Sequence, residues 1–176
     1  IDRLITEIAE AGRIDAELSR TRFVPVDMLN LAGSLVAARA ERAGDAGCGI
    51  EVAPLGDGPW EVPGDAARLE RVLENLLDNA VSFSPSGGIV TVTLERQGEM
   101  LELAVSDDGP GIPVEAREKV FERFHSLRPQ SEDFGSHSGL GLAIARTIAE
   151  AHDGALAAQD RPDGKRGACM MLTLPL

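Results

Sequence analysis

The feature that most limits the fold of this chain is a strongly amphipathic helical pattern that leads directly into two strand-like patterns. The helical pattern covers residues 65–83 and places apolar residues at i, i+3, i+4 and i+7 spacing. Residues 89–96 and Met100–Ser106 then alternate apolar and polar side chains, and a short turn joins them, which is typical of a β-hairpin. Because the helix and the hairpin each have one apolar face, the chain must fold into layers that bury these faces against each other.

Weaker patterns on both sides extend this layered arrangement. Asp27 is a good N-cap for a helix that ends near Arg42, and another helix is predicted over residues 139–152. Turns rich in Gly and Pro separate the short apolar runs. The order predicts an α/β two-layer sandwich, with a mixed, mostly antiparallel sheet and helices on one face. Further strands are predicted over residues 23–26, 50–52, 60–62, 154–159 and 168–174.

Residues 1–20 carry apolar side chains on a roughly heptad stripe, with charged residues between them. Such a helix is too short and too narrowly apolar to be stable alone, so we expect it to pack on another helix. The chain begins at Ile1, inside this pattern, and we interpret it as part of a longer protein. Two units are expected, residues 1–22 and residues 23–176.

The charge balance disfavours some classes of partner. The chain has 29 acidic and 17 basic side chains, which give a formal net charge of −12 at pH 7. This balance disfavours a broad electrostatic surface for nucleic acid or for an anionic membrane. The two cysteines, Cys48 and Cys169, form no CxxC motif, so we expect free thiols rather than a disulfide framework or a structural zinc site.

One edge of the helix at 65–83 carries Asn75, Asn79 and Ser82 beside the apolar face. Asparagine is a mediocre helix former, because its amide competes for backbone hydrogen bonds. Two solvated amides are one explanation. The other is a ligand role, since an Asn carbonyl oxygen suits Mg²⁺, which usually bridges to phosphates.

Two glycine-containing segments also allow two interpretations. Residues 106–113, Ser-Asp-Asp-Gly-Pro-Gly-Ile-Pro, follow a predicted strand. They form either a plain β-turn or a close backbone approach to a flat ligand, with a carboxylate accepting from an exocyclic amine. Residues 138–144, Ser-Gly-Leu-Gly-Leu-Ala-Ile, open the last helix. They form either a flexible helix start or an anion site built from free N–H groups and the helix dipole.

In their order and spacing, these segments resemble the ATP-binding domain of sensor histidine kinases, of the superfamily shared with gyrase, Hsp90 and MutL. Residues 73–80 (LENLLDNA) resemble its N box and residues 107–111 (DDGPG) its first glycine box. Residues 120–124 (VFERF) resemble its F box and residues 139–144 (GLGLAI) its second glycine box. The resemblance implies the Bergerat ATP-binding fold over residues 23–176.

The preceding residues 1–20 resemble the second helix of the dimerisation and phosphoacceptor hairpin of such kinases. In the finer details of its sequence, the chain is most similar to membrane-bound sensor kinases of alphaproteobacteria that respond to acid or envelope state. This implies a cytoplasmic domain of a protein anchored in the inner membrane through other segments. The implied partners are the dimerisation helices of the parent, which would form a homodimer, and a response-regulator receiver domain.

The resemblance also implies ATP and Mg²⁺ as ligands and assigns roles to residues. Asn79 would hold Mg²⁺, Asn75 would support the phosphate site, and Asp107 would bind the adenine amino group. Arg123 would reach the γ-phosphate when the lid, residues 113–138, closes over the nucleotide. Asn75 and Arg123 are thus the expected catalytic residues. The full implied ATP-binding set is Asn75, Asn79, Ser82, Phe83, Asp107, Gly109, Gly111, Ile112, Arg123, Ser138, Gly139, Leu140, Gly141 and Leu142.

Two positions depart from the family pattern. Ser82 stands where the family often has a lysine, and His137 stands where it has a glycine, two residues before Gly139. A degenerate docking module that has lost ATP is therefore one alternative. An ATPase or serine kinase of the same superfamily is another, but those relatives usually place a glutamate base where Asn75 stands, and an amide cannot accept a proton from water at neutral pH.

The phosphoacceptor histidine would lie on the first helix of the hairpin. The three histidines of this chain are His125, His137 and His152, and none of them lies in residues 1–20. We therefore expect the acceptor to lie outside this chain. The chain alone is expected to bind ATP without phosphorylating itself.

Overall fold

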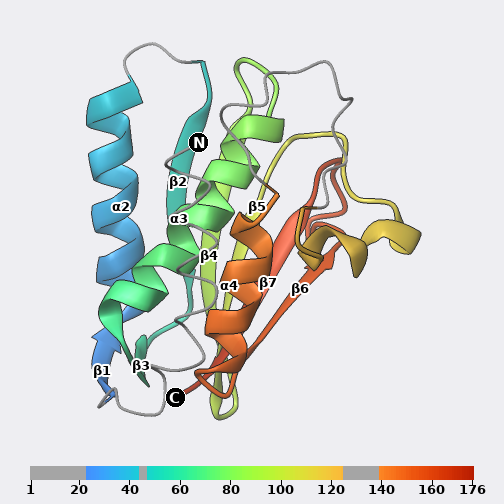
Figure 1. The fold of residues 1–176 in the computed structure, drawn as a ribbon. Coiled ribbons are helices and arrows are strands. Elements are labelled where there is room, and N and C mark those ends of the chain that lie inside the picture. The colour runs from blue at the N-terminus through green and yellow to red at the C-terminus, as the bar shows by residue number, and fades with distance from the viewer. Residues whose placement is uncertain (1–22, 44–46, 125–138) are drawn as a thin grey trace.

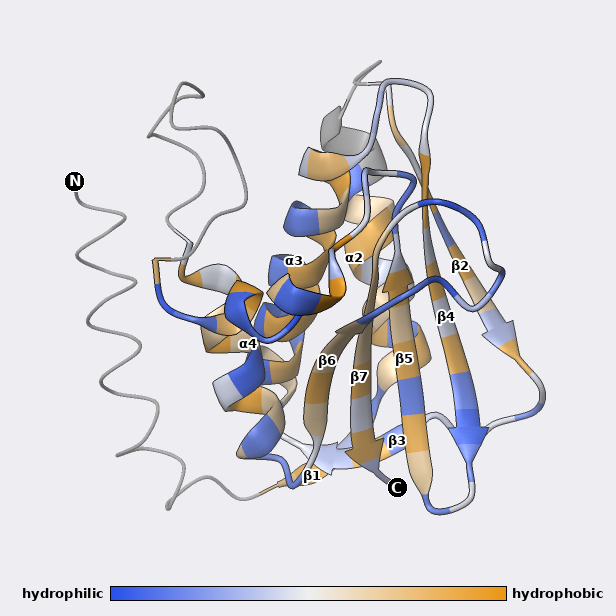
Figure 2. Ribbon diagram, turned by 90° about the vertical axis from the view of Figure 1, so that its right-hand side faces the viewer, coloured by the Kyte–Doolittle hydropathy of each residue, from blue (hydrophilic) through white to orange (hydrophobic). Residues whose placement is uncertain are grey.

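The computed structural model describes residues 23–43, 47–124 and 139–176. Over these residues the chain forms two layers, a five-stranded sheet and three helices that cover one of its faces (Figures 1 and 2). Apolar residues of both layers are buried together in one core, and Figure 2 marks the apolar positions along the helices and strands. The predicted helix over residues 1–20 and the lid residues 125–138, including Ser138 and His137, lie outside the described residues.

The sheet has the strand order β2-β4-β5-β7-β6. The edge strand β2 pairs parallel with β4, and the other three pairs are antiparallel. The predicted mixed, mostly antiparallel sheet is thus confirmed. Its strands are β2 (Gly49–Leu55), β4 (Ile89–Gln97), β5 (Met100–Ser106), β6 (Ala155–Gln159) and β7 (Cys169–Pro175).

The predicted hairpin forms from β4 and β5, with Thr91 opposite Ser106 and Gln97 opposite Met100. Alternate residues of both strands point toward the helices, and this period of two explains the sequence pattern. The buried residues of the two strands include Val90, Val92, Leu94, Leu101, Leu103 and Val105.

The helical layer consists of α2 (Met28–Ala43), α3 (Ala66–Phe83) and α4 (Gly141–Glu150). The helix α3 begins and ends where its pattern predicts. It buries the apolar stripe against the sheet, namely Leu69, Val72, Leu73, Leu76, Leu77 and Ala80. The helix α4 begins two residues later than the sequence suggests, because Gly139 has a φ of 71°, which lies outside the right-handed helical region.

Two short strands lie apart from the main sheet. The strands β1 (Val24–Asp27) and β3 (Glu61–Gly64) pair antiparallel, with Pro25 opposite Pro63. Neither proline can donate to the ladder, which is typical of strands outside a central sheet. The predicted strand at 60–62 therefore exists, but it pairs with β1 rather than with β2.

The start of α3 is held by its neighbours. Oδ1 of Asp65 accepts from the backbone N–H of Arg68 at 3.2 Å, which makes Asp65 the N-cap of the helix that the sequence predicts from this residue. The backbone N–H of Asp65 donates in turn to Nε2 of the buried His152, at 3.1 Å. Nδ1 of His152 lies 2.8 Å from the carbonyl oxygen of Ile148, and Phe23 stacks on the imidazole. The C-terminal end of α4 is thereby joined to the N-terminal end of α3.

Both cysteines are free, as predicted, with Cys169 buried and Cys48 half-buried. Among the helices of the described segments, none is long and apolar enough to cross a membrane.

The N-cap of α3 can be tested by replacing its carboxylate. We expect Asp65→Ala to lower the free energy of unfolding by about 1 kcal/mol, because the backbone N–H of Arg68 loses its acceptor. Urea denaturation measures this change. The control is Asp57→Ala in an exposed turn, which should stay within about 0.5 kcal/mol of the parent. Equal effects of the two variants would contradict the assignment of the cap.

Candidate functional site

A buried carboxylate, Asp107, directly follows the end of β5. Asp107 is 3% exposed, and its backbone N–H donates to the carbonyl oxygen of Ala168 at 2.9 Å. Its Oδ1 accepts from the backbone N–H groups of Gly109, at 2.8 Å, and Ala168, at 3.2 Å. Within the described part of the chain, no hydrogen bond reaches Oδ2, so this oxygen is available to a ligand.

Burial raises the pKa of Asp107. The two backbone N–H groups and the nearby Arg161 act in the opposite direction, but they do not offset the loss of hydration. A buried carboxylate with one unused oxygen gains from an additional donor. The site is therefore suited to a ligand that presents an N–H group, such as the exocyclic amine expected from the sequence.

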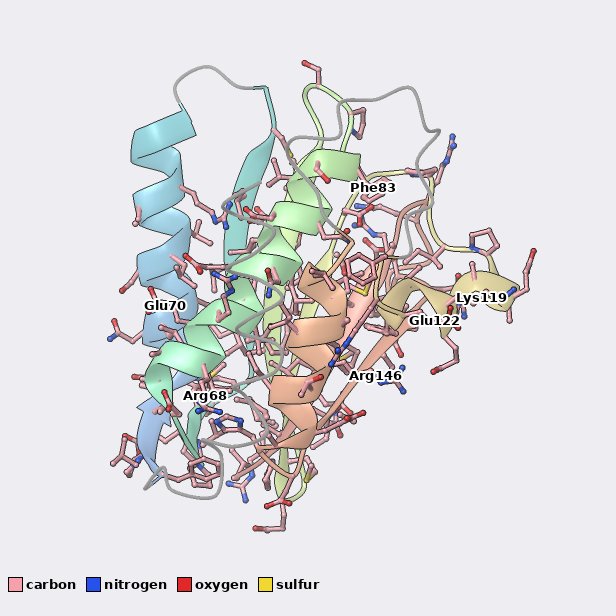
Figure 3. The ribbon with its side chains drawn as sticks, in the orientation of Figure 1. Arg68, Glu70, Phe83, Lys119, Glu122 and Arg146 are labelled. Carbon is pink, nitrogen blue, oxygen red and sulfur yellow. The ribbon has the colours of Figure 1, made fainter. Side chains whose placement is uncertain are left out.

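The first glycine box brings the backbone against the end of α3. A Cβ placed on Gly109 would lie 2.7 Å from the carbonyl oxygen of Phe83 and 2.8 Å from Oδ1 of Asp107. No other residue fits at this position without a shift of the backbone. Phe83 lies at the C-terminal end of α3, beside the segment that follows β5 (Figure 3).

The second glycine box contacts the middle of the same helix. A Cβ on Gly141 would lie 3.1 Å from Oδ1 of Asn75. Nδ2 of Asn75 is buried and has no hydrogen-bond partner among the described residues. A buried amide without a partner is costly, and a ligand that accepts a hydrogen bond would remove that cost.

The edge of α3 between these two contacts carries the remaining polar residues. It runs from Asn75 to Phe83, a length of about 12 Å at 1.5 Å per residue. Asn79 and Ser82 are half-buried on this edge, and Oγ of Ser82 donates to the carbonyl oxygen of Asn79 at 3.0 Å. The two glycine boxes therefore lie at opposite ends of one polar helix edge.

The F box is fixed to α4 by one arginine. The segment that contains the F box forms two 3-10 turns, η2 (Val114–Ala116) and η3 (Lys119–Phe121). The guanidinium of Arg146 lies 4.9 Å from the centre of the Phe121 ring and forms an ion pair with Glu118 at 2.8 Å. Figure 3 shows Arg146 on α4 beside the η3 segment, which carries Lys119 and Glu122.

The first half of the lid therefore has its own anchors, with Val120 and Phe121 buried. Arg117 adds a contact to Asp160 at 2.6 Å. Arg123 stands two residues after the end of η3 and is exposed, so its side chain is not fixed by the core.

The structure brings most of the predicted site residues together around the edge of α3. Asp107, Gly109 and Phe83 meet at one end, and Asn75 and Gly141 meet at the other. Gly111 comes close to the carbonyl oxygen of Gly167. The side chain of Leu140 is buried in the core, and those of Ile112 and Leu142 pack against it, so these three can offer only backbone groups or partial apolar contact to a ligand.

Sequence reasoning missed the loop between β6 and β7. The side chain of Arg161 is 6% exposed and contacts Asp107, Asp108 and Asp163. The run Asp-Arg-Pro-Asp-Gly-Lys-Arg-Gly at residues 160–167 has the composition of a solvated turn. The structure shows why this run ends in glycine, since a Cβ placed on Gly167 would lie 1.8 Å from the backbone carbonyl oxygen of Asp107.

The comparison with known families agrees with this geometry. Residues 64–176 match the family described as histidine kinase-, DNA gyrase B-, and HSP90-like ATPase. The chain belongs to this family. Its relatives place it among the ATP-binding catalytic domains of sensor histidine kinases.

The relatives include the sensor protein ChvG of Rhizobium meliloti (strain 1021), which is 41% identical over 184 residues. That match covers 99% of this chain and 32% of the relative. The chain thus spans about a third of the length of the curated relatives that it matches. The sequence predicted this placement among sensor kinases of alphaproteobacteria.

Two solved structures share the fold. The mycobacterial sensor histidine kinase MprB is 36% identical with a TM-score of 0.72, over 87% of this chain and 97% of that chain. Full-length ShkA, solved in complex with AMPPNP, is 27% identical with a TM-score of 0.77, over 99% of this chain and 36% of that chain.

The raised pKa of Asp107 predicts how stability depends on pH. Between the ordinary value of 3.8 and the higher native value, the folded protein binds more protons than the unfolded chain. The carboxyl therefore stabilises the fold less as the pH rises through this window. The Asp107→Asn variant has no such carboxyl group. We therefore expect its free energy of unfolding, relative to that of the unsubstituted chain, to increase as the pH rises through this window. Urea denaturation at successive pH values measures this difference.

Asp163→Asn is the matched variant with the opposite sign. The hydrogen bonds from Arg161 lower the pKa of Asp163 to about 2, so its carboxylate stabilises the fold above pH 3.8 and loses this effect as the pH falls toward 2. Relative to the parent, this variant should become less stable as the pH rises from 2 to about 4. Differences that do not change with pH in either variant would contradict the assigned shifts.

Proposed function

We propose that this chain binds Mg²⁺-ATP along the edge of α3 and donates the γ-phosphoryl group to a histidine on a dimerisation hairpin outside the chain. The observation that carries the proposal is the buried Asp107 carboxylate, which presents one oxygen at the end of a polar helix edge. The second glycine box lies at the other end of that edge. The two ends suit the base and the phosphates of one nucleotide.

At the base end, Oδ2 of Asp107 would accept a hydrogen bond from the adenine amino group. The close approach of Gly109 to Asp107 and to the end of α3 would let a flat ring lie against the backbone. Phe83 would pack along the ring, and Gly111 and Ile112 would border it. A base without an exocyclic amine at this position would leave the buried carboxylate oxygen without a donor.

At the phosphate end, Nδ2 of Asn75 would donate to a phosphate oxygen, which satisfies a group that has no partner in the described chain. Gly139, Leu140, Gly141 and Leu142 open α4, where backbone N–H groups and the helix dipole favour an anion. Leu140 stands at the N-cap and offers no side-chain acceptor, so it does not compete for these N–H groups. Ser138 would add a hydroxyl beside them.

The Mg²⁺ ion would be held chiefly by phosphate oxygens, together with the amide oxygen of Asn79. Within residues 23–43, 47–124 and 139–176, no three His, Cys, Asp or Glu side chains gather into a metal site. This fits Mg²⁺, which keeps much of its water shell and binds proteins through few oxygen ligands. When bound, the ion would neutralise phosphate charge during transfer. Ser82 lies beside Asn79 on the helix edge, and its hydroxyl donates to the backbone carbonyl oxygen of that residue.

In the transfer step, an imidazole nitrogen of the acceptor histidine would form a bond to the γ-phosphorus while the bond to the ADP oxygen breaks. The protein contributes positioning and charge. Arg123 is exposed two residues after η3, where lid closure would bring its guanidinium to the γ-phosphate. An amide at Asn75 cannot act as a base toward water, which favours transfer over hydrolysis and disfavours an ATPase.

The acceptor is proposed to lie outside the chain because the described histidine is already engaged. Both ring nitrogens of His152 are occupied, one by the backbone N–H of Asp65 and one by the carbonyl of Ile148. His125 and His137 belong to the lid, which would move with the nucleotide.

The parent protein is proposed to be a homodimeric sensor kinase with a membrane anchor outside this chain and this domain in the cytoplasm. Its phosphorylated histidine would pass the phosphoryl group to a response regulator. The histidine kinase ThkA, solved in complex with the response regulator TrrA, has a chain of the same fold. The negative net charge gives no support to a nucleic-acid partner.

The first test is nucleotide binding by calorimetry. The unsubstituted chain should bind a non-hydrolysable ATP analogue more tightly with Mg²⁺ than without it. Asn79→Ala should lose most of this Mg²⁺ dependence, because the amide ligand is gone. The control is Asn30→Ala on the exposed side of α2, which should bind as the parent does. If the unsubstituted chain gives no heat of binding at millimolar nucleotide with Mg²⁺, a docking module that no longer binds ATP is favoured.

The second test separates binding from transfer. With radiolabelled ATP, this chain alone should acquire no stable acid-labile label, because it lacks the acceptor. A separate hairpin that carries the parent's acceptor histidine should become labelled in trans, weakly, because the covalent tether that raises the effective concentration is missing. Stable acid-labile label on this chain by itself would show that an acceptor lies within it.

A further inference from the structure

The buried Arg161 donates to the backbone of Asp107, the residue whose carboxylate is proposed to bind adenine. Its side chain is 6% exposed, and it comes from the loop between β6 and β7. Nη1 donates to the backbone carbonyl oxygen of Asp107 at 2.9 Å and to Oδ1 of Asp108. An arginine in this position is expensive to bury unless every donor is used.

The other two nitrogens of the guanidinium bind one carboxylate. Nε donates to Oδ1 of Asp163 at 3.0 Å, and Nη2 donates to Oδ2 of the same residue at 2.7 Å. This two-point contact fixes the plane of the guanidinium and leaves Nη1 directed at Asp107. Asp163 itself is held by its contact with the backbone N–H of Lys165 at 3.1 Å.

Asp108 connects Arg161 to the adjacent strand β4. Its Oδ2 accepts from the backbone N–H of Ile89, at the start of β4, at 2.9 Å. Arg161 therefore joins the loop after β6 to the residues that follow β5, and through Asp108 to β4. A Cβ placed on Gly167 would lie 1.8 Å from the backbone carbonyl oxygen of Asp107, so only glycine fits where this loop passes the end of β5.

Every polar atom of Asp107 except one is thereby held by described residues. The backbone N–H and Oδ1 are bound by Ala168 and Gly109, and the carbonyl oxygen is bound by Arg161. The carboxylate plane follows from these contacts, and Oδ2 is the oxygen that remains. A lysine could not replace the arginine, since it offers one nitrogen rather than three.

We propose that Arg161 is a positioning residue that sets the direction of the Asp107 carboxylate and thereby the preference of the site for a base with an exocyclic amine. This inference rests on the proposed function and extends it to base selection. Arg161 does not touch the nucleotide in this account. Its effect should therefore appear in selectivity between bases rather than in phosphate or Mg²⁺ binding.

The test compares two nucleotides by calorimetry in the presence of Mg²⁺. ATP carries the exocyclic amine, and purine riboside 5′-triphosphate lacks it. The parent should prefer ATP by about tenfold or more, the value of one hydrogen bond to a charged group. R161M, of similar length but without donors, should lose most of this preference, with ATP affinity falling about tenfold and the analogue changing by less than about twofold.

Three further variants complete the design. R96M removes a half-exposed arginine at the opposite end of the β4–β5 hairpin and should retain the parent's preference. R161K keeps one donor, and D163N keeps the arginine but removes its two-point contact, so both should show intermediate preferences. If circular dichroism shows that R161M does not fold, these two variants decide the question.

The outcomes are distinct. A loss of preference in R161M, R161K and D163N, but not in R96M, supports the inference. Equal weakening of the binding of both nucleotides by R161M would show that Arg161 is merely structural. An unchanged preference would show that Arg161 does not direct Asp107. Either result overturns this inference and leaves the proposed function standing. Absence of binding of both nucleotides to the parent would overturn the proposed function and this inference with it.

Discussion

The site depends on the fixed, buried carboxylate of Asp107. Its Oδ1 is held by two backbone N–H groups, and its backbone joins the ends of β5 and β7. Burial of this group costs free energy, as the direction of its pKa shift indicates. The sheet therefore does more than support α3. It holds a charged group whose second carboxylate oxygen has no hydrogen-bond partner among the described residues.

The helix α3 serves the core and the site at once. Its apolar stripe packs on the sheet, and the adjacent edge carries Asn75 and Asn79. Since the same packing fixes both, small displacements of the helix would move the polar edge relative to Asp107. The contacts at its two ends oppose such displacement, with Asp65 and His152 at the start and Gly109 against Phe83 at the end. The F box adds a third element, which Arg146 joins to α4.

Much of this could be predicted from the sequence because the governing patterns are local. The period of 3.6 in α3, the period of two in β4 and β5, and the start of α3 at Asp65 each depend on neighbouring residues. The pairing of β3 with β1 could not be predicted in this way, since strand pairing depends on distant partners. The role of Arg161 was equally hidden. Its contacts bring together residues more than fifty positions apart, and its loop has the composition of an exposed turn.

The central claim is that the Asp107 carboxylate binds the adenine amino group, and one substitution tests it most directly. Asp107→Asn keeps an acceptor oxygen for the two backbone N–H groups but removes the charge. Calorimetric titration with a non-hydrolysable ATP analogue and Mg²⁺ should show an affinity about tenfold or more below that of the parent, with the fold intact. If the variant binds the analogue within about twofold of the parent, Asp107 has another role and the account fails.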